Sequence, residues 1–438
     1  MGLLQTVLPF KLDVTDESLS AHGGQALHGE YLKAVNVAET IDRELPPPGS
    51  AKGYAPSVHA IPLILMLSGG GRSLEDLRVL RSDTALRRLL QLEVMPSSDA
   101  TGDWLRRMGQ ADGLEGMHRV NRTVFQRLVS RDGRLSFTLD IDATQIVAEK
   151  RDAKWTYKSE RGYMPMVGHM AELGLVVGHE FREGNVAPQT RNLEFMQDCD
   201  AAMPKGKKIV AVRADSAAYQ AAVLNWCETT GKVFAIGADQ DSAVKAAIAA
   251  IPEGDWTSFR DGWIAETVHC MNKTGKAFRL VVMRRPRDVD LFEQGSPWRY
   301  HAVASNREDE DAAATMVWYS KRGDASENRI KEIKIGFGME SMPCGQFHAN
   351  AMFFAVGVLA YNLFLGFRAD ALDDDWSNSQ VRTVRWRLFQ TPGKVVCHAR
   401  QVVLKIAADM LDVFAQIRER CARVALNMME GGVVHATS

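Results

Sequence analysis

Two aspartates stand at the end of a stretch whose alternating apolar residues predict a β-strand. The stretch is Arg134–Thr144, with sequence RLSFTLDIDAT, and its acids are Asp140 and Asp142. Aspartate is depleted in strands and is rarely buried unless it is paired or bound to a metal. Acids two positions apart point to the same face of a strand. The pattern therefore predicts either a metal-holding strand end or a strand that runs into an Asx-type turn.

Two further acids stand at predicted element ends. Asp215 follows Lys207–Ala214, whose valines and isoleucine predict a buried strand, and Glu327 lies in a helix that we expect to begin near Asp324. Each has a local alternative. Asp215 or the next residue could cap the following helix. Glu327 could be the third-position acid of a capping box that Asp324 begins.

The positions of three acids together suggest one site: Asp142, Asp215 and Glu327. An α/β sheet brings the ends of its strands to one edge, so we expect these acids to lie there together. Three carboxylates at such an edge would form an oxygen-rich site for Mg²⁺. Two such ions, about 3.5–4 Å apart, would activate an attacking oxygen and stabilise a leaving oxygen in phosphodiester chemistry. The three acids thus predict a magnesium-dependent site for phosphodiester bonds.

Cations surround the third acid in the stretch WYSKRGDASENRIKEIK. Glu327, Lys331 and Lys334 are three to four residues apart, so a helix would present them on one face. Such a face could hold metal and phosphate together, or it could carry ordinary intrahelical ion pairs. Tyr319 and Arg322 precede the acid in the same stretch.

The elements that must position these residues form an α/β pattern. Short helices with tight turns and basic faces are predicted over residues 57–110, and they fit a helix-turn-helix or any small helical bundle. Strands alternate with helices from Gly133 to Gly237, and residues 239–309 have a β-rich texture typical of an insertion. A helical pattern then returns and continues to the end of the chain.

A basic segment, Ser377–Val424, ends the pattern. Its cations include Arg385 and Arg387, and Trp386 is among its apolar residues. We expect a helical hairpin that contacts phosphates, or else a solvated helix face.

Composition narrows the possible partners and compartments. The 438 residues carry 53 basic and 54 acidic side chains, a net charge of -1, so a nucleic-acid surface must come from local clusters of charge. The six cysteines form no CxxC pair, which argues against a zinc ribbon or disulfide framework and fits a reducing cytoplasm. No secretory signal is visible. The apolar run Ala351–Phe367 is at the lower limit for a membrane span and contains Asn362, so we expect a buried helix and no membrane partner.

Several motifs together resemble a known family. They are LDIDATQ, VRADSAAY, YSKRGDASENRIKEIK, FHANAMFFAVGVLAYNLF and RTVRWRLFQTPGKVV. In order and spacing they resemble the DDE transposases of bacterial insertion sequences, in the family numbered thirteen-eighty. The resemblance runs from about Ser73 to Ala415 and includes a long insertion before the glutamate.

The resemblance implies a ribonuclease-H-like catalytic core with a β-rich insertion, an N-terminal helical domain and a C-terminal helical tail. The expected divisions are residues 1–130 for DNA binding or dimerisation, 131–238 and 311–372 for the catalytic domain, 239–310 for the insertion and 373–438 for the basic tail. It also implies that Asp142, Asp215 and Glu327 hold two Mg²⁺ ions, for which Mn²⁺ could substitute. The expected DNA contacts are Tyr319, Arg322, Lys331, Lys334, Arg385 and Arg387.

Two departures from the family pattern affect the site. Four residues separate Arg322 from Glu327, where the family commonly has three. Asp140 also competes with Asp142 for the first ligand position. We prefer Asp142, because the family's aspartate is followed closely by threonine, here Thr144, and Asp140 could support it from behind.

The expected function is binding of transposon end repeats, with metal-dependent cleavage and strand transfer into target DNA. An inactive relative that only holds DNA ends, or another ribonuclease-H-like nuclease, is the alternative. One acid triad per chain and two ends to cut predict a homodimer on paired ends. The expected location is the bacterial cytoplasm, at the nucleoid.

Overall fold

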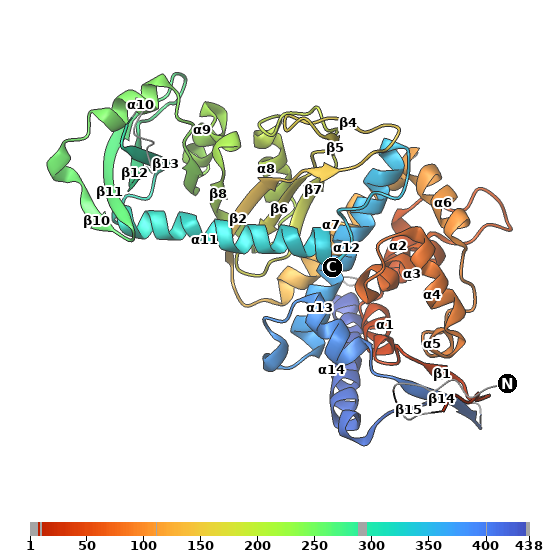
Figure 1. Cartoon of the computed structure of the whole chain (residues 1–438). Helices are drawn as coiled ribbons and strands as arrows, with labels where there is room; N and C mark the ends of the chain where they lie inside the picture. Colours follow the sequence, from red (N-terminus) through yellow and green to blue (C-terminus); the bar gives the residue numbers. More distant parts are fainter. Residues whose placement is uncertain (1–7, 9–10, 111, 288–295, 400, 435–438) are drawn as a thin grey trace.

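The computed structural model describes residues 8, 11–110, 112–287, 296–399 and 401–434. It is a mixed α/β structure in which one large sheet extends from a helical body into a protruding lobe (Figure 1). The predicted α/β class is therefore confirmed at this level.

The centre of the sheet carries the acid-bearing strands. Its strands are β2 (Ser136–Ala143), β6 (Met166–Met170), β7 (Val176–Glu180), β8 (Lys208–Ala214) and β9 (Val233–Gly237). Their order in space is β9-β8-β2-β6-β7, with β2, β8 and β9 parallel and β6 and β7 antiparallel. The parallel strands β2 and β8 are adjacent, so their carboxyl ends meet at one edge.

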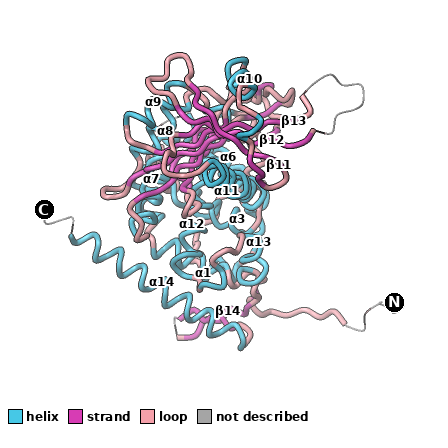
Figure 2. Tube along the Cα trace, turned by 90° about the vertical axis from the view of Figure 1, so that its left-hand side faces the viewer, coloured by secondary structure: helices cyan, strands magenta, loops and turns pink. Residues whose placement is uncertain are grey.

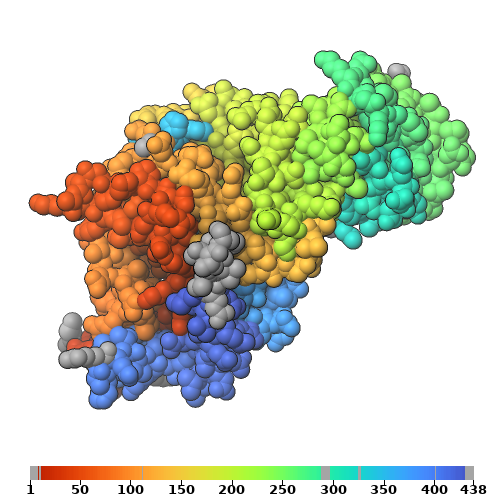
Figure 3. Space-filling model, turned by 180° about the vertical axis from the view of Figure 1, so that it is seen from behind, coloured from red at the N-terminus to blue at the C-terminus, as the bar shows by residue number. Residues whose placement is uncertain are grey.

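The β-rich segment continues this same sheet. It supplies β10 (Thr257–Phe259), β11 (Gly262–His269), β12 (Phe278–Pro286) and β13 (Trp298–Ser305). Strand β13 pairs antiparallel with β9, so the nine strands form one sheet. Figure 3 shows this segment and the start of the next helix forming a lobe at one end of the molecule.

Helix α11 (Ala312–Lys331) runs along the sheet and contacts both β2 and β8. It begins much earlier than we expected: Asp311 caps it, accepting a hydrogen bond from the backbone N–H of Ala314 at 2.6 Å. The predicted start near Asp324 is therefore wrong, and so is the capping box proposed for Glu327. The sheet is also covered by three shorter helices, α8 (Asn192–Ala201), α9 (Ala221–Thr229) and α10 (Ser242–Ala249).

The helical body surrounds α12 (Phe347–Ala371). Around it are α1 (Gln25–Ala34), α2 (Val37–Glu44), α3 (Pro56–Gly69), α4 (Leu77–Ser82), α5 (Thr84–Leu89), α6 (Ser98–Gln110) and α7 (Gly113–Arg131). Among the described helices, α12 alone is long and apolar enough to cross a membrane, and its apolar window is wholly buried in the protein. The expectation of a buried core helix is confirmed.

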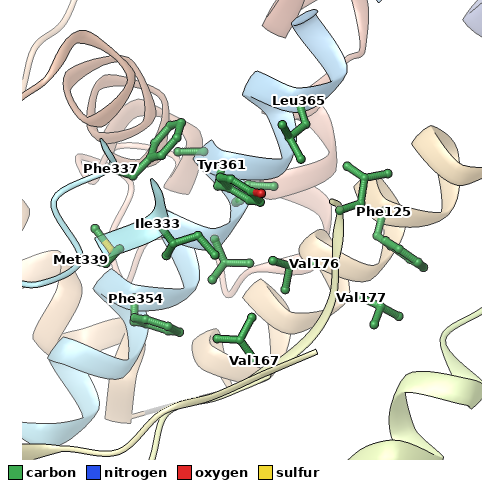
Figure 4. Packing of buried hydrophobic residues seen from close by; sticks show 14 of the residues in the cluster. Phe125, Val167, Val176, Val177, Ile333, Phe337, Met339, Phe354, Tyr361 and Leu365 are labelled. Carbon is green, nitrogen blue, oxygen red and sulfur yellow. The ribbon is translucent and has the colours of Figure 1, made fainter. Parts of the chain in front are cut away.

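Helix α12 joins the helical body to the sheet. Its Phe354 and Tyr361 lie near Val167 and Val176 of the sheet in one apolar cluster (Figure 4). The buried Asn362 side chain accepts a hydrogen bond from the Val176 N–H at 2.9 Å and donates one to the Val176 carbonyl at 2.8 Å. The Asn362 amide therefore satisfies the backbone N–H and carbonyl of Val176 on β7, the last strand of the sheet.

The C-terminal segment differs from the predicted helical hairpin. After the short α13 (Val381–Val384) come a π-helical turn (Arg385–Phe389), a β-hairpin of β14 (Gly393–His398) and β15 (Gln401–Lys405), and the single long helix α14 (Ala408–Val434). Strand β14 also pairs with the N-terminal β1 (Leu19–Ser20). Figure 2 shows α14 running beside the helical body. The prediction failed because the valine-rich run around Pro392-Gly393 favours strands.

Candidate active site

The ends of β2 and β8 bring two predicted ligands side by side. Asp140 on β2 is in register with Arg213 on β8, so Asp142 and Asp215, two residues further along each chain, lie at the carboxyl ends of neighbouring parallel strands. Asp215 also caps a short 3-10 helix, because its Oδ1 accepts a hydrogen bond from the Ala217 N–H at 3.1 Å. The capping role predicted as an alternative is present, and the second oxygen remains available.

Arg322 of α11 faces both acids. Its Nη2 is 4.0 Å from Oδ1 of Asp142 and 3.9 Å from Oδ2 of Asp215. Arg322 is 8% exposed, so this charge is held inside the protein. One buried guanidinium therefore supplies the positive charge shared by the two carboxylates.

Glu327 lies further along α11 and is exposed. Glu327 is five residues after Arg322, so on an ideal helix the two side chains point about 140° apart around the helix axis. With the family's spacing of four residues, they would point only about 40° apart. No three described His, Cys, Asp or Glu residues lie close enough together to hold a metal ion. The structure therefore brings Asp142 and Asp215 together and leaves Glu327 outside that pair.

The pKa of Asp142 reflects its burial and the charges around it. The pKa of its carboxyl is raised from 3.8 to about 6: burial is the largest cause, Arg322 lowers the pKa, and the charges of Asp215 and Glu327 raise it. The charged form of Asp142 is thus unfavourable when no further cation is present.

Asp140 is engaged behind the site. It is fully buried, and each of its carboxylate oxygens accepts a hydrogen bond from Arg213 at 2.7 Å. Arg213 also donates from Nη1 to the backbone carbonyl of Trp318 in α11 at 2.7 Å and stacks on that residue's ring. Both oxygens of Asp140 therefore have partners within the protein, and the pair ties β2, β8 and α11 together.

Sequence reasoning missed Arg213. Its signal was a charged residue inside the apolar strand KIVAVRA, two positions before Asp215 and so on the same face.

The predicted tyrosine and lysines lie in different surroundings. Tyr319 is half-buried, and its hydroxyl lies against Gly237. A Cβ atom at position 237 would be only 2.8 Å from that hydroxyl, so the contact requires glycine there. Burial and the charges of Asp215 and Asp142 raise the pKa of Tyr319, with Arg322 acting in the opposite direction.

Lys331 is exposed, whereas Lys334 is half-buried and donates from Nζ to the backbone carbonyl of Gln145 at 2.7 Å. The predicted single face for Glu327, Lys331 and Lys334 is wrong for Lys334. The helix widens into a π-helical turn at Glu332–Gly336, which changes the register of the residues in that turn.

The two predicted arginines of the C-terminal segment differ in exposure. Arg385 donates hydrogen bonds to the backbone carbonyls of Leu67, Ser68 and Gly336, and burial lowers its pKa to about 10. A phosphate contact would require Arg385 to leave these carbonyls, so in this structure it stabilises the fold. Arg387 is exposed and lies over the ring of Trp376.

The comparison with known families agrees with this arrangement. The family described as Transposase DDE domain group 1 matches residues 7–425, nearly the whole chain. The protein belongs to this family and is a transposase, an enzyme of the class that cuts and transfers DNA.

Other comparisons add little. No curated protein matches the chain. A cryo-EM structure of the piggyBac transposase synaptic complex with hairpin DNA is similar over 96% of this chain and 84% of that one, with a TM-score of 0.43 and 8% identity. The likeness is too weak to support a residue-level argument.

Proposed function

We propose that this transposase binds the terminal repeats of an insertion sequence, cuts the DNA there with the help of Mg²⁺, and joins the freed ends to a target. The observation that carries the proposal is the Asp142–Asp215 pair at the ends of adjacent parallel strands, facing a single buried guanidinium. Ligands in sheets of this kind bind at the carboxyl ends of the strands.

The acid pair fits a divalent cation. Both donors are hard carboxylate oxygens, which Mg²⁺ and Mn²⁺ accept. The pKa of Asp142 is raised, chiefly by burial, even with Arg322 beside it, so a further cation would stabilise its charged form. Asp142 and Asp215 would hold the metal, which when bound activates the attacking oxygen and stabilises the leaving oxygen.

Glu327 would complete the ligand set only if α11 turned its carboxylate toward Asp142. One extra residue accommodated as a π-bulge between Arg322 and Glu327 would produce such a rotation, and the same helix already contains a π-helical turn at Glu332–Gly336. The extra residue relative to the family pattern makes this rearrangement a specific expectation for this chain.

The remaining site residues would position DNA. Arg322 is close enough to both acids to contact a phosphate held between them. Lys334 fixes the loop after Asp142 through Gln145, and Tyr319 lies between the acids and β9. Lys331 and Arg387 are exposed cations able to reach a phosphate backbone.

The sheet order supports a ribonuclease-H-like core. Strands β2, β6 and β7 form an antiparallel meander, and β8 and β9 add in parallel on the other side of β2. On this basis we propose residues 131–238 and 311–372 as the catalytic domain, 239–310 as an insertion that extends its sheet, and 1–130 and 373–438 as flanking regions. We further propose that the enzyme acts as a homodimer on double-stranded DNA at the bacterial nucleoid.

A second candidate follows from the exposed position of Glu327. A protein with only two converging acids could hold DNA ends without cutting them, as an inactive relative would. A nuclease of the same fold with a different substrate is a less favoured possibility, because the family match covers nearly the whole chain.

A cleavage assay separates these candidates. Asp142→Asn, Asp215→Asn and Glu327→Gln should each abolish Mg²⁺-dependent cutting of DNA that carries the element's ends, while binding in EDTA stays within about twofold of wild type because no phosphate-binding cation is lost. Arg387→Gln is the complementary variant: it removes an exposed cation able to reach a phosphate and leaves the acids intact, so it should weaken end binding without abolishing cutting. Cleavage that survives Glu327→Gln would remove Glu327 from the ligand set, and a wild-type protein that binds ends without cutting them would favour the inactive relative.

A further inference from the structure

A small sheet beside the acid pair carries two exposed aromatic rings. It consists of β3 (Ile146–Val147), β4 (Lys154–Trp155) and β5 (Arg161–Tyr163), in the order β3-β5-β4. Trp155 is 65% exposed and Tyr157 is 64% exposed. The two rings are two residues apart on one hairpin, and neighbouring exposed apolar side chains of this kind are a feature of surfaces that contact a partner.

The turn that carries these rings is closed by backbone hydrogen bonds. Thr156, between the two aromatic residues, is buried, and its backbone N–H donates to the Glu160 carbonyl at 2.8 Å. Ser159 has a φ of 60°, which closes the turn with a hydrogen bond from its N–H to the Thr156 carbonyl at 3.0 Å. The rings are therefore held outward by an ordered backbone, at a low entropic cost for binding.

Gln145 connects this turn to the acid pair. It stands three residues after Asp142, and its side-chain amide donates to Oγ1 of Thr156 at 2.8 Å and to Oε2 of Glu160 at 3.0 Å. Its backbone carbonyl accepts the hydrogen bond from Lys334. The aromatic turn is therefore hydrogen-bonded, through Gln145, to the segment that directly follows Asp142.

The charge of the hairpin favours a polyanion. Of its acids, Glu149 pairs with Arg161 at 3.4 Å, Asp152 pairs with Arg151 at 2.9 Å, and Glu160 accepts the Gln145 amide. Three lysines form no salt bridge with any residue that the structure describes: Lys150, Lys154 and Lys158. Residues 149–161 hold five basic side chains against three acidic ones, so the net charge of the hairpin region is positive. Lys158 lies over the Tyr157 ring, with its Nζ 5.6 Å from the ring centroid.

We propose that the β4–β5 hairpin binds an unpaired stretch of a DNA strand next to the acid pair, with Trp155 and Tyr157 stacking on its bases and Lys154 and Lys158 contacting its phosphates. Aromatic residues interleaved with lysines form the usual surface for single strands, because every base has a face on which a ring can stack. The inference rests on the proposed function, which requires a strand to leave the duplex at the cut. It assigns the binding site of that strand to the β4–β5 hairpin.

The test compares two ligands with the same backbone charge, in EDTA so that no cleavage occurs. One is an oligothymidylate of about 20 nucleotides, longer than a typical single-strand site, and the other is its abasic analogue. The wild-type protein should bind the base-bearing strand more tightly. Trp155→Ala and Tyr157→Ala should each reduce that preference about 5- to 100-fold, and Trp155→Phe should retain most of it.

Two control variants complete the test. Trp386→Ala removes another exposed tryptophan, 78% exposed and flanked by arginines but outside the hairpin, and should leave the preference unchanged. Lys158→Gln should weaken the binding of both ligands equally, because one phosphate contact is lost. For the same reason, the slope of log affinity against log salt concentration should fall by about 0.7. Melting temperatures of the four aromatic variants should match wild type, since the replaced rings are exposed.

The outcomes separate this inference from the proposed function. An equal affinity for both ligands, or an equal loss of preference in Trp386→Ala, overturns the hairpin assignment even if the enzyme cleaves DNA. A change of oligomeric state in Trp155→Ala without a change in preference would make the surface a contact between protein copies and would also overturn it. The protein could also prefer the base-bearing strand through Trp155 and Tyr157 and yet never cut DNA. That result supports the hairpin assignment and contradicts the proposed cleavage activity.

Discussion

At the scale of single residues, the site is a balance of charges around one buried guanidinium. Asp142 and Asp215 share the guanidinium of Arg322, and one cation is too little for two carboxylates and the nearby Glu327. Burial is the main reason that the pKa of Asp142 is raised, and the charges of Asp215 and Glu327 add to the effect. A site that is electrostatically strained without metal is well prepared to bind one.

We predict that Asp142→Asn stabilises the metal-free enzyme. The pKa of Asp142 in the folded protein is raised from 3.8 to about 6, so its charge opposes folding at neutral pH, by at most about 3 kcal/mol. In EDTA the melting temperature of the variant should exceed that of wild type by up to about 3 °C at pH 7.5. The difference should shrink as the pH falls from 6 toward 4, because wild-type Asp142 then becomes neutral as well.

Asp76→Asn is the control with the opposite sign. Asp76 accepts hydrogen bonds from the backbone N–H groups of Arg72 and Ser73, at 2.8 and 2.9 Å, and these bonds lower its pKa. Neutralising it should reduce stability at pH 7.5 and matter less in acid. Equal melting temperatures for Asp142→Asn and wild type across this pH range would show that the carboxylates are not strained.

At the scale of elements, the site depends on how α11 is attached to the sheet. Behind the acids, Asp140 of β2, Arg213 of β8 and the Trp318 carbonyl of α11 meet in one buried hydrogen-bonded group. Each of these residues is two to four positions from a residue that faces the site. The group therefore fixes the relative position of Asp142, Asp215 and Arg322, and it acts as a positioning device.

We predict that Arg213→Lys weakens metal binding more than it weakens the fold. Lysine keeps the positive charge but cannot bond both oxygens of Asp140 and the Trp318 carbonyl in one plane. The affinity for Mn²⁺, measured by calorimetry without DNA, should fall about tenfold or more, and cleavage should fall with it, while end binding in EDTA is retained.

Arg284→Lys provides the matched control. Arg284 is equally buried at 4% exposed, pairs with Glu253, and stacks on Trp256 and Trp298 with ring distances of 4.2 and 4.6 Å. It lies on β12, away from the acids. Its replacement should lower the melting temperature by a similar amount without changing the affinity for Mn²⁺, and a parallel loss of affinity in both variants would contradict a specific role for Arg213.

At the scale of the whole molecule, the N- and C-terminal segments form one body. Helix α14 packs on α1 and α12 through Phe414, Ile417 and Cys421, and β14 pairs with β1. The insertion lobe lies at the opposite end of the sheet (Figure 3). The strands that lead to the two acids, β2 and β8, therefore lie between the strands of the lobe and the helical body.

We predict that two protomers assemble on a pair of ends and that each cuts one. Light scattering should give two protein chains per paired-end complex. Mixing equal amounts of wild type and Asp215→Asn before DNA is added should give about half of the complexes with a single cut end, because each mixed dimer has one working site. A mixture that yields only doubly cut and uncut complexes would mean that one protomer serves both ends.

The sequence alone determined the features that depend on local pattern. Alternation identified the strand that leads to Asp142, and valine and isoleucine content identified the buried strand before Asp215. The apolar run identified α12 as a core helix. The motifs around these acids also indicated the family. These predictions needed no knowledge of which segments meet in space.

Tertiary structure decided what depends on distant partners. Arg213 meets Asp140 from 73 residues away, and Arg385 reaches the carbonyl of Leu67 across 318 residues, so no local pattern could reveal that one supports the site and the other the fold. The C-terminal hairpin is part of a three-stranded sheet whose third strand lies near the other end of the chain. The side of α11 on which Glu327 lies follows from where that helix begins and how it is attached, which is set by its contacts with the sheet.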